Sequence, residues 1–445
     1  MNYEEFQKLV IAEAQKSGIR QYELYYSEEE NISAEAMKGE LSSFSSDKQA
    51  GACFRCIAGG KMGYCATELF TEEQASEIVR KAIENASTVE NEDEVFLFSE
   101  GSVYRQAVQK ELPEADLAGI VLSMQEAACK ADHRVQDGSL SEAFTTQGSV
   151  RIVNSEGLDL ARRYSYQGVG MMAVLKDEDS LYNAAQIEIR PLTELDPKKV
   201  AEKAVQKTVE RIGAQLVDTG QYPVVFDADA MGEILTAYSS IFSADMAQKG
   251  LSLLSGKEGT AIAAECVTVI DDPYDPESPV QTPFDAEGVP SCTKTVIEKG
   301  LLKTLLHNLK TAAKAGIVST GNASKAGYAS PVEVSPYSFY LTKGEHSLDD
   351  LFKDAGNGVY ITGVKGLHAG TNAVTGDFSI ECAGFLIENG KKERAITSFT
   401  VSGNFFELLK NIQEVADDLY FQMPRGFSRI GSPSVLVRGL SVAGK

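Results

Sequence analysis

The sequence predicts an α+β fold, in which an N-terminal region of helices and antiparallel sheet precedes a β-rich, barrel-like C-terminal domain. In the first half, helical periods and strand patterns follow one another twice, as helix–sheet–helix and again as helix–sheet–helix. In the second half, Gly, Asn, Asp and Pro turns separate short apolar segments, which is typical of a sandwich or barrel. The 445 residues also exceed the roughly 250–300 at which a single core stops growing, so two domains are expected.

The first helix–sheet–helix unit is expected over residues 1–95. The helical spacing of Phe6, Val10 and Ala14 predicts a first helix, which Gly18 ends. A second helix is expected over 71–86, and an acidic connector over 90–94 follows it. Five short strands are expected between the two helices, with turns at 39–40 and 59–60: 22–27, 31–37, 41–45, 50–58 and 61–67.

The second unit is expected over residues 110–215, which makes the N-terminal region 1–215 a loose internal duplication. Its first helix is expected to begin after Leu112, with Pro113 in the first turn, and to end near Lys130. Its last helix begins at Asp196, a suitable N-cap residue followed by proline. Strands are expected between 141 and 189, with interruptions at Gly148, 155–157 and 176–179.

The C-terminal domain is expected over residues 221–445, because 213–221 is the best candidate for a domain boundary. A single helix is predicted near 229–246. The clearest strand patterns in this domain are 296–306, 358–364, 383–388 and 435–442.

The formal charge of −22 argues against nucleic acid and acidic membranes as partners, since both are bound through clustered Lys and Arg. The chain shows no signal peptide pattern at its first residues and no apolar stretch of the ~20 residues that span a bilayer. Its seven cysteines are scattered, as in proteins of a reducing compartment. A cytoplasmic location is expected, with peptides, proteins or small molecules as partners.

Common catalytic motifs are absent from the sequence. The four histidines are far apart, and no HExxH or HExxxH pair occurs. Cys53 and Cys56 form a CxxC, but strand alternation places them on opposite faces. There is no GxSxG nucleophile motif and no P-loop. Carboxylates that could act as acid and base occur at Asp271 and in the pair Asp285 and Glu287, although ordinary turn chemistry explains them as well.

The C-terminal half contains a series of short motifs: IDDP at 270–273, PFDAEGVP at 283–290, IEKGLL at 297–302, STGNA at 319–323, VTGDFS at 374–379, FLIENG at 385–390, SGN at 402–404 and VAG at 442–444. In this order they resemble the TldD/PmbA family, and in particular its TldE (PmbA) branch, historically called modulators of DNA gyrase. The chain length and the layout of the N-terminal half are also similar to this family.

The resemblance implies a metallopeptidase assembly of two kinds of subunit. In TldD-type members, an HExxxH helix and a downstream cysteine hold zinc, with the glutamate as general base. The helix expected to correspond is 233–241, which contains no histidine, and no cysteine follows Cys382. We therefore assign no catalytic residue and no metal to this chain, and expect the zinc in a TldD-like partner.

The resulting hypothesis is a non-catalytic, TldE-like subunit of a peptidase that degrades or trims unfolded peptides and small proteins. An independent hydrolase with a carboxylate-bound metal and a homodimeric peptide-binding or scaffold protein are the alternatives. Motif residues expected to shape strand turns or the peptide site are Asp285, Glu287, Gly288, Gly321, Asn322, Gly376 and Asp377.

Overall fold

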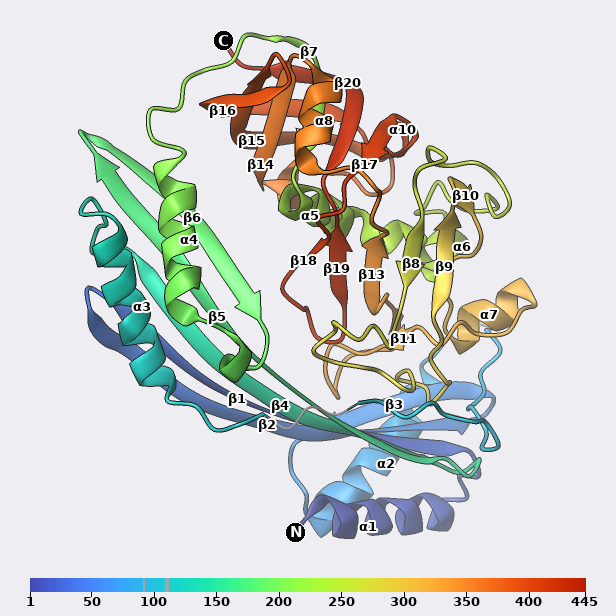
Figure 1. Cartoon of the computed structure of the whole chain (residues 1–445). Helices are drawn as coiled ribbons and strands as arrows, with labels where there is room; N and C mark the ends of the chain where they lie inside the picture. The colour runs from blue at the N-terminus through green and yellow to red at the C-terminus, as the bar shows by residue number, and fades with distance from the viewer. Residues whose placement is uncertain (91–92, 109–111) are drawn as a thin grey trace.

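The computed structural model describes residues 1–90, 93–108 and 112–445. Its N-terminal region is built on one curved, six-stranded antiparallel sheet, at the lower left of Figure 1. The strand order is β3–β2–β1–β4–β5–β6, so the two halves of the region join where β1 pairs with β4. These strands are Tyr22–Met37 (β1), Glu40–Ala58 (β2), Lys61–Thr67 (β3), Leu140–Asn154 (β4), Asp159–Asp177 (β5) and Ser180–Ile189 (β6).

Two pairs of helices lie on the same face of this sheet. Leu24 and Ala34 point to one side of β1, because strand residues separated by an even number share a face. Leu24 packs under α1 and α2, whereas Ala34 packs under α3 and α4. The helices are Tyr3–Lys16 (α1), Glu72–Ser87 (α2), Leu117–Ala131 (α3) and Pro197–Val209 (α4), with a short 3-10 turn at Leu192–Glu194 (η1).

The C-terminal region contains a closed barrel of five strands in the order β16–β15–β14–β7–β20. Pairing of β16 with the last residues of β20 closes the barrel, and β17 pairs with the first residues of β20. Helix α8 packs on the outside of the barrel. The elements are Gly220–Phe226 (β7), Leu348–Ala355 (α8), Gly358–Lys365 (β14), Leu367–Gly370 (α9), Asp377–Glu388 (β15), Lys391–Asn404 (β16), Phe405–Lys410 (α10), Ile412–Val415 (β17) and Val435–Ala443 (β20).

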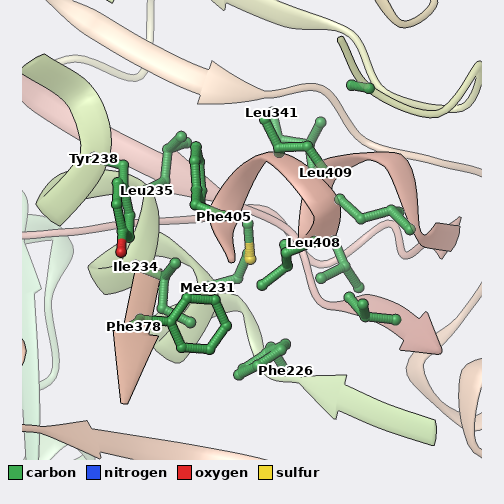
Figure 2. Packing of buried hydrophobic residues seen from close by; sticks show 14 of the residues in the cluster. Phe226, Met231, Ile234, Leu235, Tyr238, Leu341, Phe378, Phe405, Leu408 and Leu409 are labelled. Atoms are coloured by element: carbon green, nitrogen blue, oxygen red, sulfur yellow. The ribbon is translucent and has the colours of Figure 1, made fainter. Parts of the chain in front are cut away.

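A second sheet, β10–β9–β8–β13–β19–β18, shares one hydrophobic core with the barrel. Helix α5 lies between them, and Figure 2 shows its side chains meeting those of α10, where Tyr238 stacks on Phe405 at 4.4 Å between ring centroids. The elements are Ala228–Tyr238 (α5), Ser239–Phe242 (η2), Ala244–Gln248 (α6), Val269–Asp271 (β8), Lys294–Glu298 (β9), Leu301–Leu302 (β10), Leu309–Ala315 (α7), Ala323–Ser324 (β11), Glu333–Val334 (β12), Ser338–Leu341 (β13), Tyr420–Phe421 (β18) and Arg429–Ser432 (β19).

The predicted α+β fold with a barrel-like C-terminal domain is confirmed, but the strands are longer than expected. The breaks predicted at 28–30 and 46–49 do not occur, since β1 and β2 pair with each other throughout these segments. Gly148 does not end a strand either. It lies within β4, where the Tyr164 hydroxyl occupies the space that a Cβ would need. The single strand expected at 296–306 is a hairpin of β9 and β10, with positive φ at Lys299 and Gly300 in its turn.

Two helices also differ from the prediction. Helix α3 begins at Leu117 rather than directly after Leu112, because the Asp116 carboxylate caps it by accepting a hydrogen bond from the Gly119 N–H. The helix expected at 229–246 is divided into α5, η2 and α6, and the Ser239 hydroxyl donates to the Thr236 carbonyl where α5 ends. Parts of the predicted connector 90–94 and the start of the predicted unit 110–215 lie outside the described residues.

The face of the N-terminal sheet opposite its helices packs against the C-terminal region. Tyr25 and Ile152 on this face form a cluster with Phe284 and Tyr328 of the C-terminal region. The Arg162 side chain crosses the same boundary, with its guanidinium carbon 3.9 Å from the Phe427 ring centroid. We call this boundary the seam. Within the described part of the chain, no helix is long and apolar enough to cross a membrane.

Candidate functional site

A cleft of about 450 Å³ lies at one end of the seam, between two sheet edges. Strand β6 is an edge of the N-terminal sheet and β18 is an edge of the second sheet, and both line the cleft. Its volume is within the usual range for ligand sites. The cleft is thus bounded by edge strands from both regions of the chain.

Backbone groups of β6 are directed toward this cleft. The Tyr420 hydroxyl of β18 donates to the Ile187 carbonyl of β6 at 3.3 Å, so that carbonyl points away from the neighbouring strand β5. In an antiparallel edge strand, the N–H and C=O of such a residue both face outward. An extended peptide can pair with an edge of this kind through its main chain alone, without a particular sequence.

Charged side chains fix the wall opposite β6. Arg429 donates from Nη2 to Asp275 at 2.6 Å and from Nη1 to the Glu277 carbonyl at 2.9 Å. Its guanidinium also lies over the Phe421 ring, 3.7 Å from the centroid. Because Arg429 and Asp275 are both buried, this ion pair holds β18 and β19 against the loop after β8.

Helix α5 lies directly behind the cleft. The Gln422 amide, which lines the cleft, donates to the Asp229 backbone carbonyl and to its carboxylate, both at 2.8 Å. At the start of α5, the Asp227 carboxylate caps the helix by accepting from the Ala230 N–H. Burial raises the pKa of Asp227 to about 7 and that of Glu233, further along the same helix, also to about 7.

Five of the seven predicted residues lie together, at the seam rather than in the cleft. Asp285 is buried and accepts three backbone hydrogen bonds, from Glu287 and Val289 at Oδ1 and from Ala323 at Oδ2. Burial raises the pKa of Asp285 above its usual range, the neighbouring Glu287 carboxylate raises it further, and the three N–H donors oppose the shift. Asp285 therefore fixes the turn that follows it.

The Glu287 carboxylate joins that turn to the N-terminal sheet. Its Oε2 accepts from the Leu309 N–H at 2.9 Å, and its Oε1 lies 3.5 Å from Arg55 Nη1 on β2. Arg55 is also bonded through Nε to Glu23 on β1, at 2.8 Å. Gly288 follows at φ +83°, and a Cβ there would lie 2.6 Å from the Leu158 side chain. A side chain here would have to displace the Leu158 methyl group, and the positive φ also favours glycine.

Gly321 and Asn322 reach the same cluster from a later loop. Gly321 has φ +68° and approaches the Pro290 carbonyl, where a Cβ would lie at 2.6 Å. The buried Asn322 amide donates to Asp271 at 2.8 Å and to the Ser335 carbonyl at 3.0 Å. Asp271 also accepts from Lys294 at 3.0 Å and from the Tyr337 N–H at 2.7 Å.

Gly376 and Asp377 are not part of this cluster. They lie at the start of β15, where their carbonyls accept from the Tyr238 hydroxyl of α5. The exposed Asp377 carboxylate accepts from the Asn404 amide at 2.9 Å, which lowers the pKa of that carboxyl. The pair therefore joins α5 to the barrel.

Some charged side chains of the candidate site do not belong to any sequence motif. Glu23 and Arg55 come from the N-terminal sheet, and only the register of β1 with β2 places them side by side. The described residues also include a histidine and two carboxylates that could together ligate a cation, namely His346, Asp354 and Glu414. Their ligand atoms lie within 4.8 Å of one another. It lies between α8 and β17, and sequence spacing gives no sign of it.

Family models for the three parts of PmbA/TldA metallopeptidases match the chain in order. Domain 1 matches residues 22–86, the central domain matches 109–212 and the C-terminal domain matches 219–444. A protein named metalloprotease from Methanothermobacter thermautotrophicus is 28% identical over 430 residues, which cover 91% of each chain. The metalloprotease PmbA homolog of Haemophilus influenzae is 29% identical over 328 residues, 73% of this chain and 69% of that protein.

Solved structures of similar proteins share the whole fold. A candidate modulator of a DNA gyrase from Thermotoga maritima superposes with a TM-score of 0.90 at 30% identity, covering 99% of this chain and 100% of that one. TldE from Thermococcus kodakarensis superposes with a TM-score of 0.88 over 98% of this chain and 99% of that one. At 23% identity, the second likeness is evidence for the fold alone.

Proposed function

Because this chain belongs to the PmbA/TldD metallopeptidase family, we propose that it is the TldE/PmbA-like, non-catalytic subunit of a two-subunit metallopeptidase. Its partner is a TldD-type chain that holds the zinc, and together they degrade or trim unfolded peptides and small proteins. This chain supplies a wall of the peptide-binding chamber and no metal ligand. We place the complex in the cytoplasm, and the seven free thiols of the chain fit a reducing compartment.

One observation carries the proposal: a cleft with two sheet edges adjoins a helix, α5, that contains no histidine. Helix α5 covers most of the segment in which the family resemblance places the zinc motif. The titratable side chains of α5 are those of Asp229, Glu233 and Tyr238, and the Tyr238 hydroxyl already bonds to the barrel. A cleft that could hold an extended peptide, beside a segment without histidine, supports a role as the non-catalytic subunit.

The alternative of an independent hydrolase finds less support, because its candidate carboxylates already have protein partners. Asp271 and Asp285 accept from backbone, amide and ammonium groups on both oxygens, and both are buried. Glu287 is engaged by Leu309 and Arg55. A metal would have to displace these groups, at the cost of leaving buried donors unpaired.

Co-expression tests the proposed pairing. The chain is purified alone and together with the HExxxH homologue from the same genome, and zinc and hydrolysis of an unfolded protein are measured. We expect a stable complex with about one zinc per heterodimer, and hydrolysis only by the complex. The absence of a complex, or EDTA-sensitive hydrolysis by the isolated chain, would contradict the proposal. A homodimeric scaffold would instead give a dimer in sedimentation that gains no activity from the homologue.

The peptide-binding role of the β6 edge is tested separately. Proline at Ile187 removes an outward N–H from the cleft without removing a bond to β5. Leu181→Pro is the matched control, since Leu181 lies six residues earlier on the same edge and does not line the cleft. We expect Ile187→Pro to reduce hydrolysis by the complex at least tenfold and Leu181→Pro to leave it unchanged. Equal activity of the two variants would exclude the β6 edge as the peptide site.

A further inference from the structure

On one side, the N-terminal sheet ends in a strand that is only partly paired (Figure 1). Strand β3 pairs with residues 52–58 of β2. Residues 40–51 of β2 pair with β1, and no other strand in the described structure lies along their outer side. A bulge interrupts the register with β1 near Leu41, so the regular part of this stretch is 43–51. We call residues 43–51 the free edge.

The outward backbone groups of the free edge belong to its even-numbered residues. The turn after Ala58 contains two residues, so Ala58 and Lys61 form a hydrogen-bonded pair between β2 and β3. Bonding directions alternate along an antiparallel strand, so the N–H and C=O groups of Phe44, Ser46 and Lys48 also point away from β1. Among the described residues, no hydrogen bond to these backbone groups is found. The free edge therefore offers a row of unpaired donors and acceptors.

The free edge lacks much of the usual protection against pairing with another chain. Edge strands in natural proteins are commonly blunted by proline, by charged side chains or by a covering helix or loop. Residues 41–46 contain neither proline nor a charged side chain. Residues 40–49 are exposed except for the half-buried Ser45, and Phe44 is 58% exposed. An open edge of this kind favours the addition of a further strand.

The sequence of the free edge is complementary to itself. When two copies meet antiparallel with Ser46 opposite Ser46, Phe44 of one copy lies opposite Lys48 of the other, and Ser45 lies opposite Asp47. The outward residues of the two copies then face one another as hydrogen-bonded pairs. The lysine stem and ammonium cover the phenyl ring, and the serine hydroxyl donates to the carboxylate. Both faces of the joined strands are thus matched.

Neighbouring registers are less favourable. With Asp47 or Lys48 on the twofold axis, two identical charges lie directly opposite each other, which destabilises a strand pair. A shift in the other direction brings the bulge near Leu41 into the paired stretch. The register centred on Ser46 avoids both costs.

We propose that the free edge of β2 pairs with the same edge of a second copy of this chain, which joins the two N-terminal sheets into one. Because both copies use the same surface, the contact is closed and gives a dimer rather than a fibre. The free edge and β6 lie on opposite sides of the sheet, so this contact does not use the β6–β18 cleft. The inference does not depend on a TldD-type partner, since hydrolysis with the homologue, not self-association, tests the proposed peptidase.

Sedimentation of the purified full chain tests self-association, and amide hydrogen exchange tests where it occurs. We expect a reversible dimer, with slower exchange over residues 43–50 at concentrations at which the dimer forms. A chain that stays monomeric at its highest soluble concentration would overturn the proposal, as would a dimer without protection of this segment. If the segment becomes protected only when the HExxxH homologue is added, its occupant is that homologue and not a second copy.

Charge variants of Ser46 test the register. Ser46→Asp and Ser46→Lys each place two identical charges on the twofold axis, so each should raise the dissociation constant of the dimer several-fold. An equimolar mixture of the two variants places opposite charges there and should restore the dimer. Ser180→Lys is the matched control, because Ser180 is an exposed serine of β6, and it should sediment like the wild-type chain. Unchanged dimers in both Ser46 variants, or no recovery in the mixture, would overturn the proposed contact.

Discussion

Arg55 holds a buried charge network at the seam. Its side chain is only 12% exposed, and it bridges Glu23 of β1 and Glu287 of the C-terminal region. Burial raises the pKa of Glu23, whereas the arginine charge lowers it. A buried ion pair contributes little net stability, but removal of one member leaves the other charge uncompensated. The network therefore depends on the presence of all three side chains.

Replacement of Arg55 by methionine should destabilise the chain by about 3–5 kcal/mol, because it leaves two buried carboxylates without a cation. Chemical denaturation monitored by circular dichroism measures this loss. Arg80→Met provides the comparison, since Arg80 pairs with Glu77 and Glu84 on the exposed surface of α2. A surface pair of this kind contributes only about 0–1 kcal/mol. Similar losses of stability in the two variants would show that the buried network at the seam contributes no more than a surface ion pair.

The stability of the chain should be equally sensitive to substitution of Asn322, although this side chain carries no charge. Its amide group makes three hydrogen bonds in a fully buried position, with Asp271, Ser335 and Thr320. Asn322→Ala should cost about 2–4 kcal/mol, because it leaves several buried partners unsatisfied. Asn183→Ala, at an exposed position of β6, should change the stability by less than about 0.5 kcal/mol. A small loss at Asn322 would mean that water replaces the amide.

At the scale of elements, the stability of α5 should depend on pH. Asp227 caps its first turn, and the pKa values of Asp227 and Glu233 are both raised by burial to about 7. In the unfolded chain, an aspartate titrates near pH 4. Below about pH 4 both states hold the proton and this contribution to stability is complete. It is lost as the pH rises toward 7, since only the folded state still binds the proton.

Stability should therefore fall between about pH 4 and pH 7, by up to about 1.4 kcal/mol per pH unit for each such carboxyl, and level off above pH 7. Asp227→Asn keeps an N-cap but cannot ionise, so its stability should depend less on pH. Denaturation curves at pH 5, 6, 7 and 8 measure the difference. Asp47→Asn, on the exposed part of β2, should retain the wild-type dependence. An unchanged slope in Asp227→Asn would show that Asp227 is ionised in the folded state.

Local patterns predicted the type of most elements but not their length. The sequence predicts a break at 28–30, yet β1 continues through it because strands on both sides pair with its backbone. Gly148 suggested a turn, whereas its small size admits the Tyr164 ring within the sheet. Both errors have the same cause, since neighbouring strands determine whether a polar or glycine-containing segment stays extended.

The candidate site was predictable only where its residues lie in one turn. Asp285, Glu287 and Gly288 are close in sequence, and Asn322 joins them through a motif loop. Glu23 and Arg55 come from two strands of the N-terminal sheet, and no motif in either strand indicates that they lie side by side. The β6–β18 cleft was likewise unpredictable, since its edges are defined by strand order.

At the scale of the whole molecule, the seam couples the N-terminal sheet to the C-terminal region. We expect the wild-type chain to unfold in one calorimetric transition, because apolar contacts and the Arg55 network both cross the seam. Gly288→Val combines a strained φ with a contact to Leu158 across this boundary, so the transition should split or move to lower temperature.

Gly256→Val separates the two causes. Gly256 has a similar φ of +66°, but nothing lies within 4 Å of a Cβ there. It should lower the melting temperature less and keep a single transition. If both glycine variants behave alike, backbone strain alone explains the effect and the seam does not couple the two regions.

The closed barrel has a consequence for how the protein is made. Strand β7 ends at Phe226, but its two neighbours in the barrel, β14 and β20, begin only at Gly358 and Val435. During synthesis, β7 therefore leaves the ribosome long before either partner exists, with both edges open to pairing with other chains. Barrel closure is thus a late event in the life of the nascent chain, and chaperones that shield exposed strands would act in that interval.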